Sequence, residues 1–190
     1  MTEDPPCGAG LRRDALANRE RLLAAAVTTL LRAGSRASMA EVAAAAGVGV
    51  GTLYRHYPGR EALLAALTER SFRLVLDAVE DAAGRDEPAL TALDRFLDRT
   101  IEHRDQLVLP LHGGPAQLTP AAARTRDRVH DTLQHLLERG RRDGSIRPDV
   151  TAADVVVFGA MLAQPLSSTA DWARAARHQK AIFLRGVGGS

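Results

Sequence analysis

The chain has 190 residues, of which 45 % are hydrophobic and 25 % are charged, a balance typical of a globular protein with a real core. No apolar run reaches the about 18 residues of a membrane span, and the first residues lack the apolar stretch of a signal peptide, so we expect a cytoplasmic protein. The single cysteine, Cys7, excludes an internal disulfide and a cysteine-based zinc cluster.

Positive charge is concentrated near the N-terminus. The formal net charge is only +2, but Leu11–Arg60 carries eight arginines and three acidic residues, a local excess of +5. The remainder of the chain therefore carries −3. This asymmetry favours a polyanionic partner for that end of the molecule, the alternative being a solvated basic surface.

The N-terminal third predicts a disordered tail over 1–13 and then three helices. Apolar residues at helical spacing predict a helix over 18–33. The stretch Ser38-Met-Ala-Glu41 has the spacing of a capping box, which predicts a short helix over 39–46. Gly47 ends that helix, and a second short helix is expected over 50–57, where Pro58 stops it.

The rest of the chain predicts further helices and no strand. Their expected ranges are about 59–83, 89–103, 105–112, 119–142, 151–165 and 171–186. Thr151 and Asp154 have the spacing of another N-terminal cap. The sequence therefore predicts an all-α protein.

Two short helices joined by a three-residue turn containing glycine predict a helix-turn-helix, whose second helix enters the DNA major groove. Leu53 is the apolar residue expected to fix this helix to the core. Tyr54 and Tyr57, the only tyrosines of the chain, are expected to donate hydroxyl hydrogen bonds to phosphates, and Arg55 to bind a guanine edge or a phosphate. The alternative is that the tyrosines are core aromatics, above all Tyr57, which precedes Pro58.

The residues predicted to bind DNA are Ser38, Met39, Gly49, Val50, Gly51, Thr52, Tyr54, Arg55, His56, Tyr57 and Arg60.

The segments RERLLAAAVTTLLRAG and ASMAEVAAAAGVGVGTLYRHYPGREALLAAL resemble the DNA-binding domain of the TetR family of bacterial transcriptional regulators. The resemblance implies a three-helix DNA-binding domain, here 14–68, and a C-terminal helical ligand-binding and dimerisation domain, here 69–187, with about nine helices in all. Gly49 departs from the family pattern, which usually has Ser or Thr there, so a capping hydroxyl and its phosphate contact are missing. Tyr57 and Arg60 replace the commoner Phe and Lys.

The segment 137–161 resembles the C-terminal domain of a subgroup of these regulators. The family implies a homodimer formed by the last two helices, and two recognition helices about 34–36 Å apart would match a palindromic operator in double-stranded DNA. An intrachain core is the alternative role for the same side chains. The residues predicted to form the dimer interface are Val155, Gly159, Leu166, Trp172, Ala176 and Phe183.

A pocket for an unidentified small-molecule effector is expected between the C-terminal helices, although core packing is the default role for each residue. Its predicted lining is Phe72, Phe96, Thr100, His103, Leu107, Leu111, His130, Leu133, Gln134, Phe158, Met161 and Leu162. His130 and His135 are five residues apart and do not share a helical face, so no metal site and no cofactor are expected.

The leading hypothesis is a homodimeric repressor that a small molecule releases from its operator. A regulator that activates, or that needs its ligand to bind DNA, is the nearest alternative. An enzyme is a weaker hypothesis, because no catalytic triad, phosphate-binding loop or paired carboxylates are present. A helical adaptor that binds proteins and not DNA is the third class.

Overall fold

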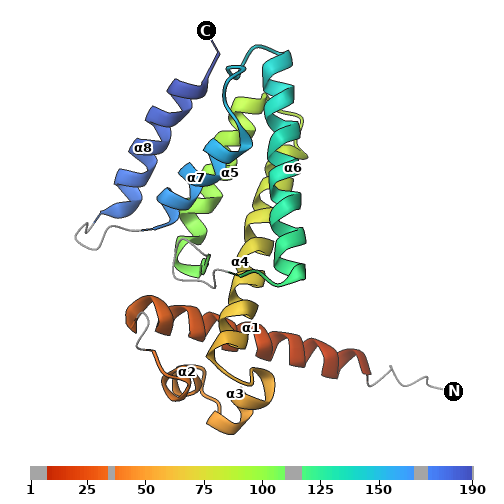
Figure 1. The fold of residues 1–190 in the computed structure, drawn as a ribbon, viewed down its shortest axis with the longest axis vertical. Helices are drawn as coiled ribbons and strands as arrows, with labels where there is room; N and C mark the ends of the chain where they lie inside the picture. The colour runs from red at the N-terminus through yellow and green to blue at the C-terminus, as the bar shows by residue number, and fades with distance from the viewer. Residues whose placement is uncertain (1–7, 34–36, 110–116, 165–170, 190) are drawn as a thin grey trace, which may run out of the picture. The chain divides into compact units, whose positions relative to one another are not determined.

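A computed structural model of the chain describes residues 8–33, 37–109, 117–164 and 171–189. Contacts within the chain divide it into two compact units, Met1–Ala66 and Leu67–Ser190. This boundary lies two residues before the predicted one, which followed position 68. The described residues are almost entirely helical, and their only β pairing is an isolated bridge between Ile146 and Gly188 (Figure 1).

The first unit contains α1 (Gly8–Ala33), α2 (Met39–Ala45), α3 (Val50–His56) and the first turns of α4 (Arg60–Ala83). Helix α2 packs against both α1 and α3. Apolar side chains from all four helices are buried, as their spacing predicted. The largest of these buried side chains are Leu22, Leu23, Val27, Val42, Leu53 and Leu63.

Helix α1 begins earlier than expected. It starts at Gly8, so residues 8–13, predicted to belong to a disordered tail, are helical in the structure. The sequence LRRDALANRERLL, which follows Gly10, is rich in leucine, arginine and alanine, which have high helix propensity. No proline interrupts it after Pro6, so the helix extends through a region whose apolar periodicity is weak.

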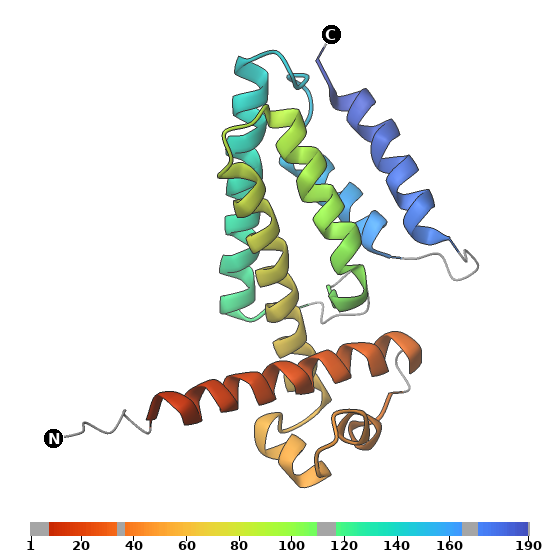
Figure 2. The same ribbon diagram turned by 180° about the vertical axis from the view of Figure 1, so that it is seen from behind.

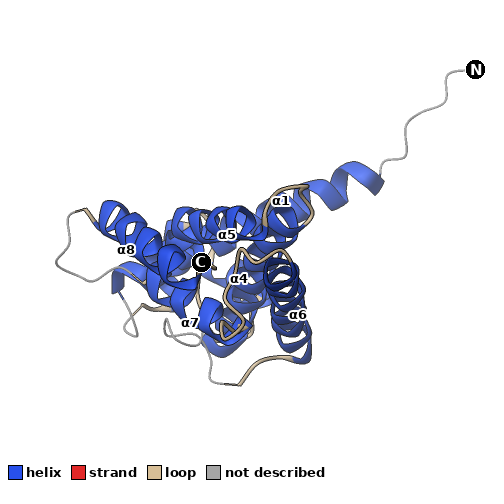
Figure 3. Ribbon diagram, turned by 90° about the horizontal axis from the view of Figure 1, so that it is seen from above, coloured by secondary structure: helices blue, strands red, loops and turns tan. Residues whose placement is uncertain are grey.

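The second unit is a helical bundle built around α5 (Ala89–His103). Helices α6 (Pro120–Arg142), α7 (Ala152–Ala163) and α8 (Trp172–Val187) all pack against α5. Figures 1 and 3 show α8 and α6 on opposite sides of it, and Figure 2 gives the view from behind. The core of this unit includes Leu76, Val79, Leu93, Leu97, Ile101, Leu133, Leu137, Val155 and Leu162.

The helix predicted over 105–112 is wrong in the part that the structure describes. Only a 3-10 turn, η2 (Arg104–Gln106), is present, and the backbone is extended at Leu107. The Val108 N–H donates to the Ser71 hydroxyl at 2.8 Å, and its carbonyl accepts from the Thr68 hydroxyl at 3.1 Å. The backbone of Val108 is therefore bonded to buried side chains of α4, and Pro110 next in line disfavours helix at Leu109. Leu111 and His112 lie outside the described residues.

The expected helix starts agree with the structure elsewhere. Thr151 and Asp154 form a full capping box at the start of α7, and the Thr119 hydroxyl caps α6. Eight α-helices and one 3-10 turn are described, against the about nine helices expected. None of the described helices is long and apolar enough to cross a lipid bilayer.

Lys180 fixes α8 to α5. Its Nζ lies 2.6 Å from an oxygen of Asp94 and 2.7 Å from an oxygen of Asp98, which are one helical turn apart on α5. Burial of the ammonium group lowers the pKa of Lys180, but the hydrogen bonds to the two carboxylates outweigh this effect, and the pKa is raised overall. The lysine is therefore charged at any physiological pH and holds both carboxylates.

We expect Lys180→Met to lower the free energy of unfolding by about 1–3 kcal/mol, because it removes two charge-assisted hydrogen bonds and leaves two carboxylates facing each other. The matched control is Arg174→Met, since Arg174 forms an exposed ion pair with Asp171 on the same helix and is expected to matter by less than about 0.5 kcal/mol. Denaturant unfolding measures both. Equal effects of the two substitutions would show that Lys180 does not hold α8.

Candidate nucleic-acid interface and ligand cavity

The start of α2 is fixed by the predicted capping box. The Ser38 hydroxyl accepts from the Glu41 N–H at 3.2 Å, and the Glu41 carboxylate accepts from the Ser38 N–H at 2.7 Å. Hydrogen bonds from the Ser38 backbone and then its side chain lower the pKa of Glu41. The cap is therefore intact at neutral pH, and its stabilisation is lost only as pH falls through the lowered pKa of this carboxyl.

The turn between α2 and α3 depends on Gly47. Its φ is +66°, a left-handed conformation that glycine adopts without steric cost. The Val48 N–H then donates to the Ala43 carbonyl at 3.0 Å, which closes the turn back onto α2. The chain can thus reverse direction within three residues and begin α3 at Val50.

Helix α3 presents one face to the interior and the other to solvent. Leu53 is fully buried, as expected for the residue that fixes the helix. Val50, Gly51, Tyr54, Arg55 and His56 are exposed, and Thr52 is half-buried. The Arg55 side chain lies along its own helix, where Nη2 donates to the Thr52 hydroxyl at 3.1 Å. The exposed face carries hydroxyl, imidazole and guanidinium groups suited to phosphates and base edges.

The two tyrosines have different positions. Tyr54 is 47 % exposed, whereas Tyr57 is only 5 % exposed and its hydroxyl accepts a 3.4 Å hydrogen bond from Arg19 Nε of α1. Tyr57 ends α3 with an extended backbone, which turns its ring toward the interior just before Pro58. The prediction that both phenols lie on the exposed face is therefore met by Tyr54 alone.

Three other predicted residues surround the ends of α2 and α4. Arg60 is half-buried, and its guanidinium donates to the Ala37 carbonyl, which ties the first turn of α4 to the segment before α2. Ser38 is exposed and Met39 is half-buried. Arg60 therefore has a structural role in holding the segment before α2, in addition to its predicted contact with DNA.

Two arginines of α1 that sequence reasoning did not select lie beside α3. Arg19 and Arg21 line a hollow of about 240 Å³ together with Thr52 and His56. Both arginines belong to the basic segment that the charge count identified, but apolar periodicity places them only on the outer side of α1. That these two arginines lie close to α3 can be seen only in the three-dimensional structure.

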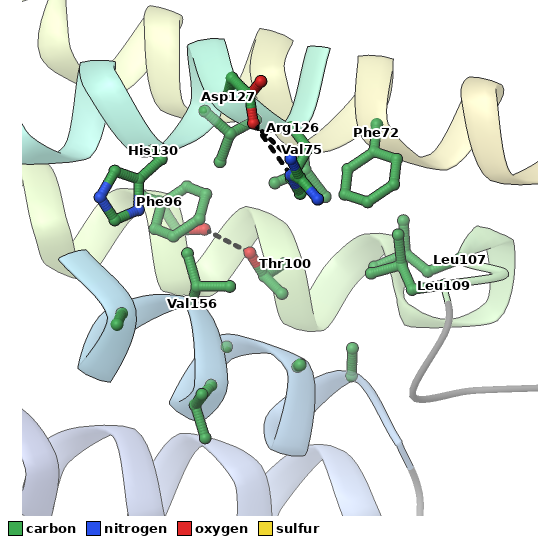
Figure 4. A pocket seen from close by; sticks show the side chains of 16 residues that line it. Phe72, Val75, Phe96, Thr100, Leu107, Leu109, Arg126, Asp127, His130 and Val156 are labelled. Carbon is green, nitrogen blue, oxygen red and sulfur yellow. Dashed lines mark hydrogen bonds and ion pairs between the residues drawn. The ribbon is translucent and has the colours of Figure 1, made fainter. Parts of the chain in front are cut away.

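The second unit contains a cavity of about 310 Å³ among α4, α5, α6 and α7 (Figure 4). Five of the predicted pocket residues line it: Phe72, Phe96, Thr100, Leu107 and His130. Sequence reasoning missed the other lining residues, which are Val75, Leu109, Arg126, Asp127, Val129, Ala153, Val156, Val157, Gly159, Ala160 and Ala163. Most of these are small or aliphatic and carry no chemical signal in the sequence.

The other predicted pocket residues lie elsewhere, and Leu111 lies outside the described residues. Leu133 and Leu162 are buried in the core of the bundle and do not line the cavity. Gln134 donates to Glu138, and His103 is bonded to Gln106. Met161 is 63 % exposed, and the Phe158 ring stacks on Phe183.

The residues predicted for a dimer interface fall into two groups, apart from Leu166, which is outside the described residues. Val155, Gly159 and Ala176 are buried within the chain itself. Trp172 and Phe183 are half-buried. The Trp172 indole donates to the Leu162 carbonyl at 3.0 Å, and the Phe183 ring centroid lies 4.0 Å from that of Phe158.

Some large apolar side chains of α7 and α8 are exposed. Among them are Val157, Met161 and Ile182. We call these three residues the apolar patch.

Within the part of the chain that the structure describes, no three histidine, cysteine or acidic residues come together as metal ligands.

A basic helix-turn-helix unit followed by a separate helical bundle defines a bacterial transcriptional regulator. Residues 22–67 match the family described as bacterial regulatory proteins, tetR family. Residues 87–188, more than half of the chain, match the C-terminal domain described as transcriptional regulator SbtR-like. The chain belongs to the TetR family.

Individual relatives are moderately similar. The regulator NfxB of Pseudomonas aeruginosa is 29 % identical over 140 residues, which cover 73 % of this chain and 74 % of NfxB. The uncharacterized regulator YvdT of Bacillus subtilis is 30 % identical over 99 residues, so the chain spans about half the length of that relative. The crystal structure of a TetR regulatory protein from Mycobacterium vanbaalenii superposes with a TM-score of 0.67 at 29 % identity, covering 94 % of this chain and 99 % of that one.

The missing cap of α3 gives a testable prediction. Gly49 has φ −66° and makes no side-chain cap, and an added Cβ would meet only the Thr52 hydroxyl, at 3.9 Å. Gly49→Ser and Gly49→Ala should therefore both fit, but only serine supplies an acceptor for the first turn. We expect the serine variant to be more stable than the alanine variant by about 1 kcal/mol in denaturant unfolding. Equal stabilities would mean that α3 does not depend on its cap.

Proposed function

We propose that the chain is a transcriptional repressor that binds a palindromic DNA operator as a homodimer and leaves it when a small molecule occupies the cavity. The main support for this proposal is that α3 has one buried apolar face and one exposed polar face. Leu53 fixes its inner face, while its outer face offers Tyr54, Arg55 and His56 to solvent. No other helix of the first unit combines shortness, a glycine turn before it and an exposed polar face in the described residues.

In the proposed complex α3 enters the major groove and α2 crosses above it. The Tyr54 hydroxyl donates to a phosphate and fixes the register of the helix, and Arg55 leaves the Thr52 hydroxyl to bind a guanine edge or a phosphate. The local excess of +5 supplies the salt-dependent part of the affinity, because each phosphate contact releases counterions.

The homodimer is supported by the apolar patch. Val157, Met161 and Ile182 are 53 %, 63 % and 44 % exposed, and the stacked rings of Phe158 and Phe183 are half-buried on the same helices. An exposed apolar surface of this kind is characteristic of an interaction site. A second copy of the chain would cover it by two-fold symmetry and would supply the second recognition helix that a palindrome requires.

Regulation is proposed to run through α4. This single helix carries Arg60, which holds the segment before α2, and also Phe72 and Val75, which line the cavity. A ligand that fits the cavity better in one arrangement of α4 than in another shifts the population of DNA-binding dimers by that difference in affinity.

The test is selection of bound sequences from a random pool of double-stranded DNA by the purified protein at near-physiological salt. We expect a palindromic motif whose half-sites are about one helical turn apart. Failure to enrich any sequence, with a folded protein, would count against DNA reading. If the protein bound its operator only after a ligand was added, the ligand would promote DNA binding, which is the opposite of the proposed regulation.

The difference between the two tyrosines gives a matched pair of variants. Tyr54→Phe removes an exposed hydroxyl and should weaken operator binding by roughly three- to tenfold, with an unchanged salt dependence because the hydroxyl carries no charge. Tyr57→Phe removes the interior bond from Arg19 and should lower stability slightly while leaving DNA affinity nearly unchanged. Fluorescence anisotropy of a labelled operator over a range of salt concentrations measures both. If Tyr57→Phe had the larger effect on affinity, the proposed orientation of α3 would be wrong.

A further inference from the structure

Most of the wall of the 310 Å³ cavity is apolar, and its charged and imidazole groups are confined to Arg126, Asp127 and His130 of α6. Phe72 and Val75 come from α4, Phe96 from α5, and Val129 from α6, while α7 adds aliphatic and small residues. We propose that the ligand is an uncharged, predominantly apolar molecule, an inference that rests on the proposed function of the cavity as an effector site. A charged group placed against such a wall would lose its hydration without gaining a partner.

Thr100 is the buried polar side chain among the described residues of the wall. Its hydroxyl donates to the Phe96 carbonyl at 3.0 Å, within α5 (Figure 4). Because the hydroxyl proton of Thr100 is used in this bond, the hydroxyl oxygen can take part in a further hydrogen bond only as an acceptor. A ligand with one N–H or O–H donor could use this acceptor, whereas a carboxylate or phosphate, which only accepts, could not.

The charged residues at the cavity are already paired with each other. Arg126 of α6 donates to the same Asp127 oxygen from Nε at 3.0 Å and from Nη2 at 2.7 Å (Figure 4). Both side chains are more than half exposed, so the pair adds little stability. It nevertheless cancels the charge that Arg126 would offer to an anion. An anionic ligand bound at this guanidinium would also be repelled by the Asp127 carboxylate beside it.

The size of the cavity limits the ligand further. A volume of about 310 Å³ lies at the lower end of the range for sites that bind drug-sized molecules. Gly159, Ala160 and Ala163 provide the space on the α7 side. Larger residues at these positions would fill the cavity, so the same helix offers direct variants for a test.

The test compares two fluorescent probes with the same ring skeleton, N-phenyl-1-naphthylamine, which is neutral, and 8-anilinonaphthalene-1-sulfonate, which carries a sulfonate. Both emit strongly only in an apolar site. We expect the neutral probe to bind one site per chain. The sulfonate should bind roughly tenfold or more weakly, because its charge would lie against a mostly apolar wall and next to the Asp127 carboxylate. Equal or tighter binding of the sulfonate would overturn the inference.

Two variants identify the cavity as the binding site. Ala160→Phe places a ring in the cavity and should reduce binding of the neutral probe by roughly tenfold or more. If that variant fails to fold, Val156→Phe is the milder form, because Val156 is 40 % exposed and its larger ring can relax toward solvent. Gln134→Phe, on the part of α6 that does not line the cavity, is the control and should bind the probe normally. Unchanged binding by both cavity variants would overturn the assignment.

The ion pair between Arg126 and Asp127 can be tested by a separate variant. Asp127→Asn removes the negative charge beside the Arg126 guanidinium, so it should strengthen binding of the sulfonate several-fold and change binding of the neutral probe much less. No change for the sulfonate would show that the ion pair does not govern selectivity. These measurements need no DNA. If the neutral probe binds as expected but no operator is found, the inference about the cavity stands and the proposed function fails. If an operator is found but the neutral probe does not bind in the cavity, the inference about the cavity fails and DNA binding stands.

Discussion

The burial of Leu53 is the interaction on which the first unit depends. Helix α3 has seven residues, too few to be stable in isolation, so its conformation must come from packing. Leu53 supplies that packing, and the left-handed Gly47 and the capped start of α2 set the direction from which the chain arrives. Once one face of so short a helix is buried, the opposite face is necessarily exposed. The polar residues proposed to meet DNA are therefore oriented by an apolar contact on the other side.

Helix α5 has the corresponding central role in the second unit. One side packs its leucines into the core, a second side binds Lys180 of α8 through two carboxylates, and a third side presents Phe96 and Thr100 to the cavity. A ligand that contacts these two residues would stabilise whichever arrangement of the bundle it fits better.

The sequence predicted well those features that local chemistry determines. The capping boxes at Ser38 and Thr151, the turn at Gly47 and the burial of Leu53 each depend on residues a few positions apart, and all are present. Apart from the early start of α1, which local helix propensity explains, the failures involve distant partners. The segment at Val108 is not helical because Thr68 and Ser71 bind its backbone, and Tyr57 turns inward, where its hydroxyl accepts from Arg19. On α6, Val129 and not Leu133 faces the cavity, a choice that helical spacing alone leaves open because both are apolar.

The clamp on α8 uses the only lysine of the chain, and all other permanently cationic side chains are arginines. Lys180 is buried and bound to two carboxylates, so no lysine is present on the proposed DNA-binding surface. Acetylation neutralises lysine but has no counterpart of that kind for a guanidinium, which remains charged at every physiological pH. Lysine acetylation therefore cannot remove a positive charge from the proposed DNA-binding surface. In the proposed mechanism, the time the protein spends on its operator is controlled by ionic strength and by the ligand in the cavity.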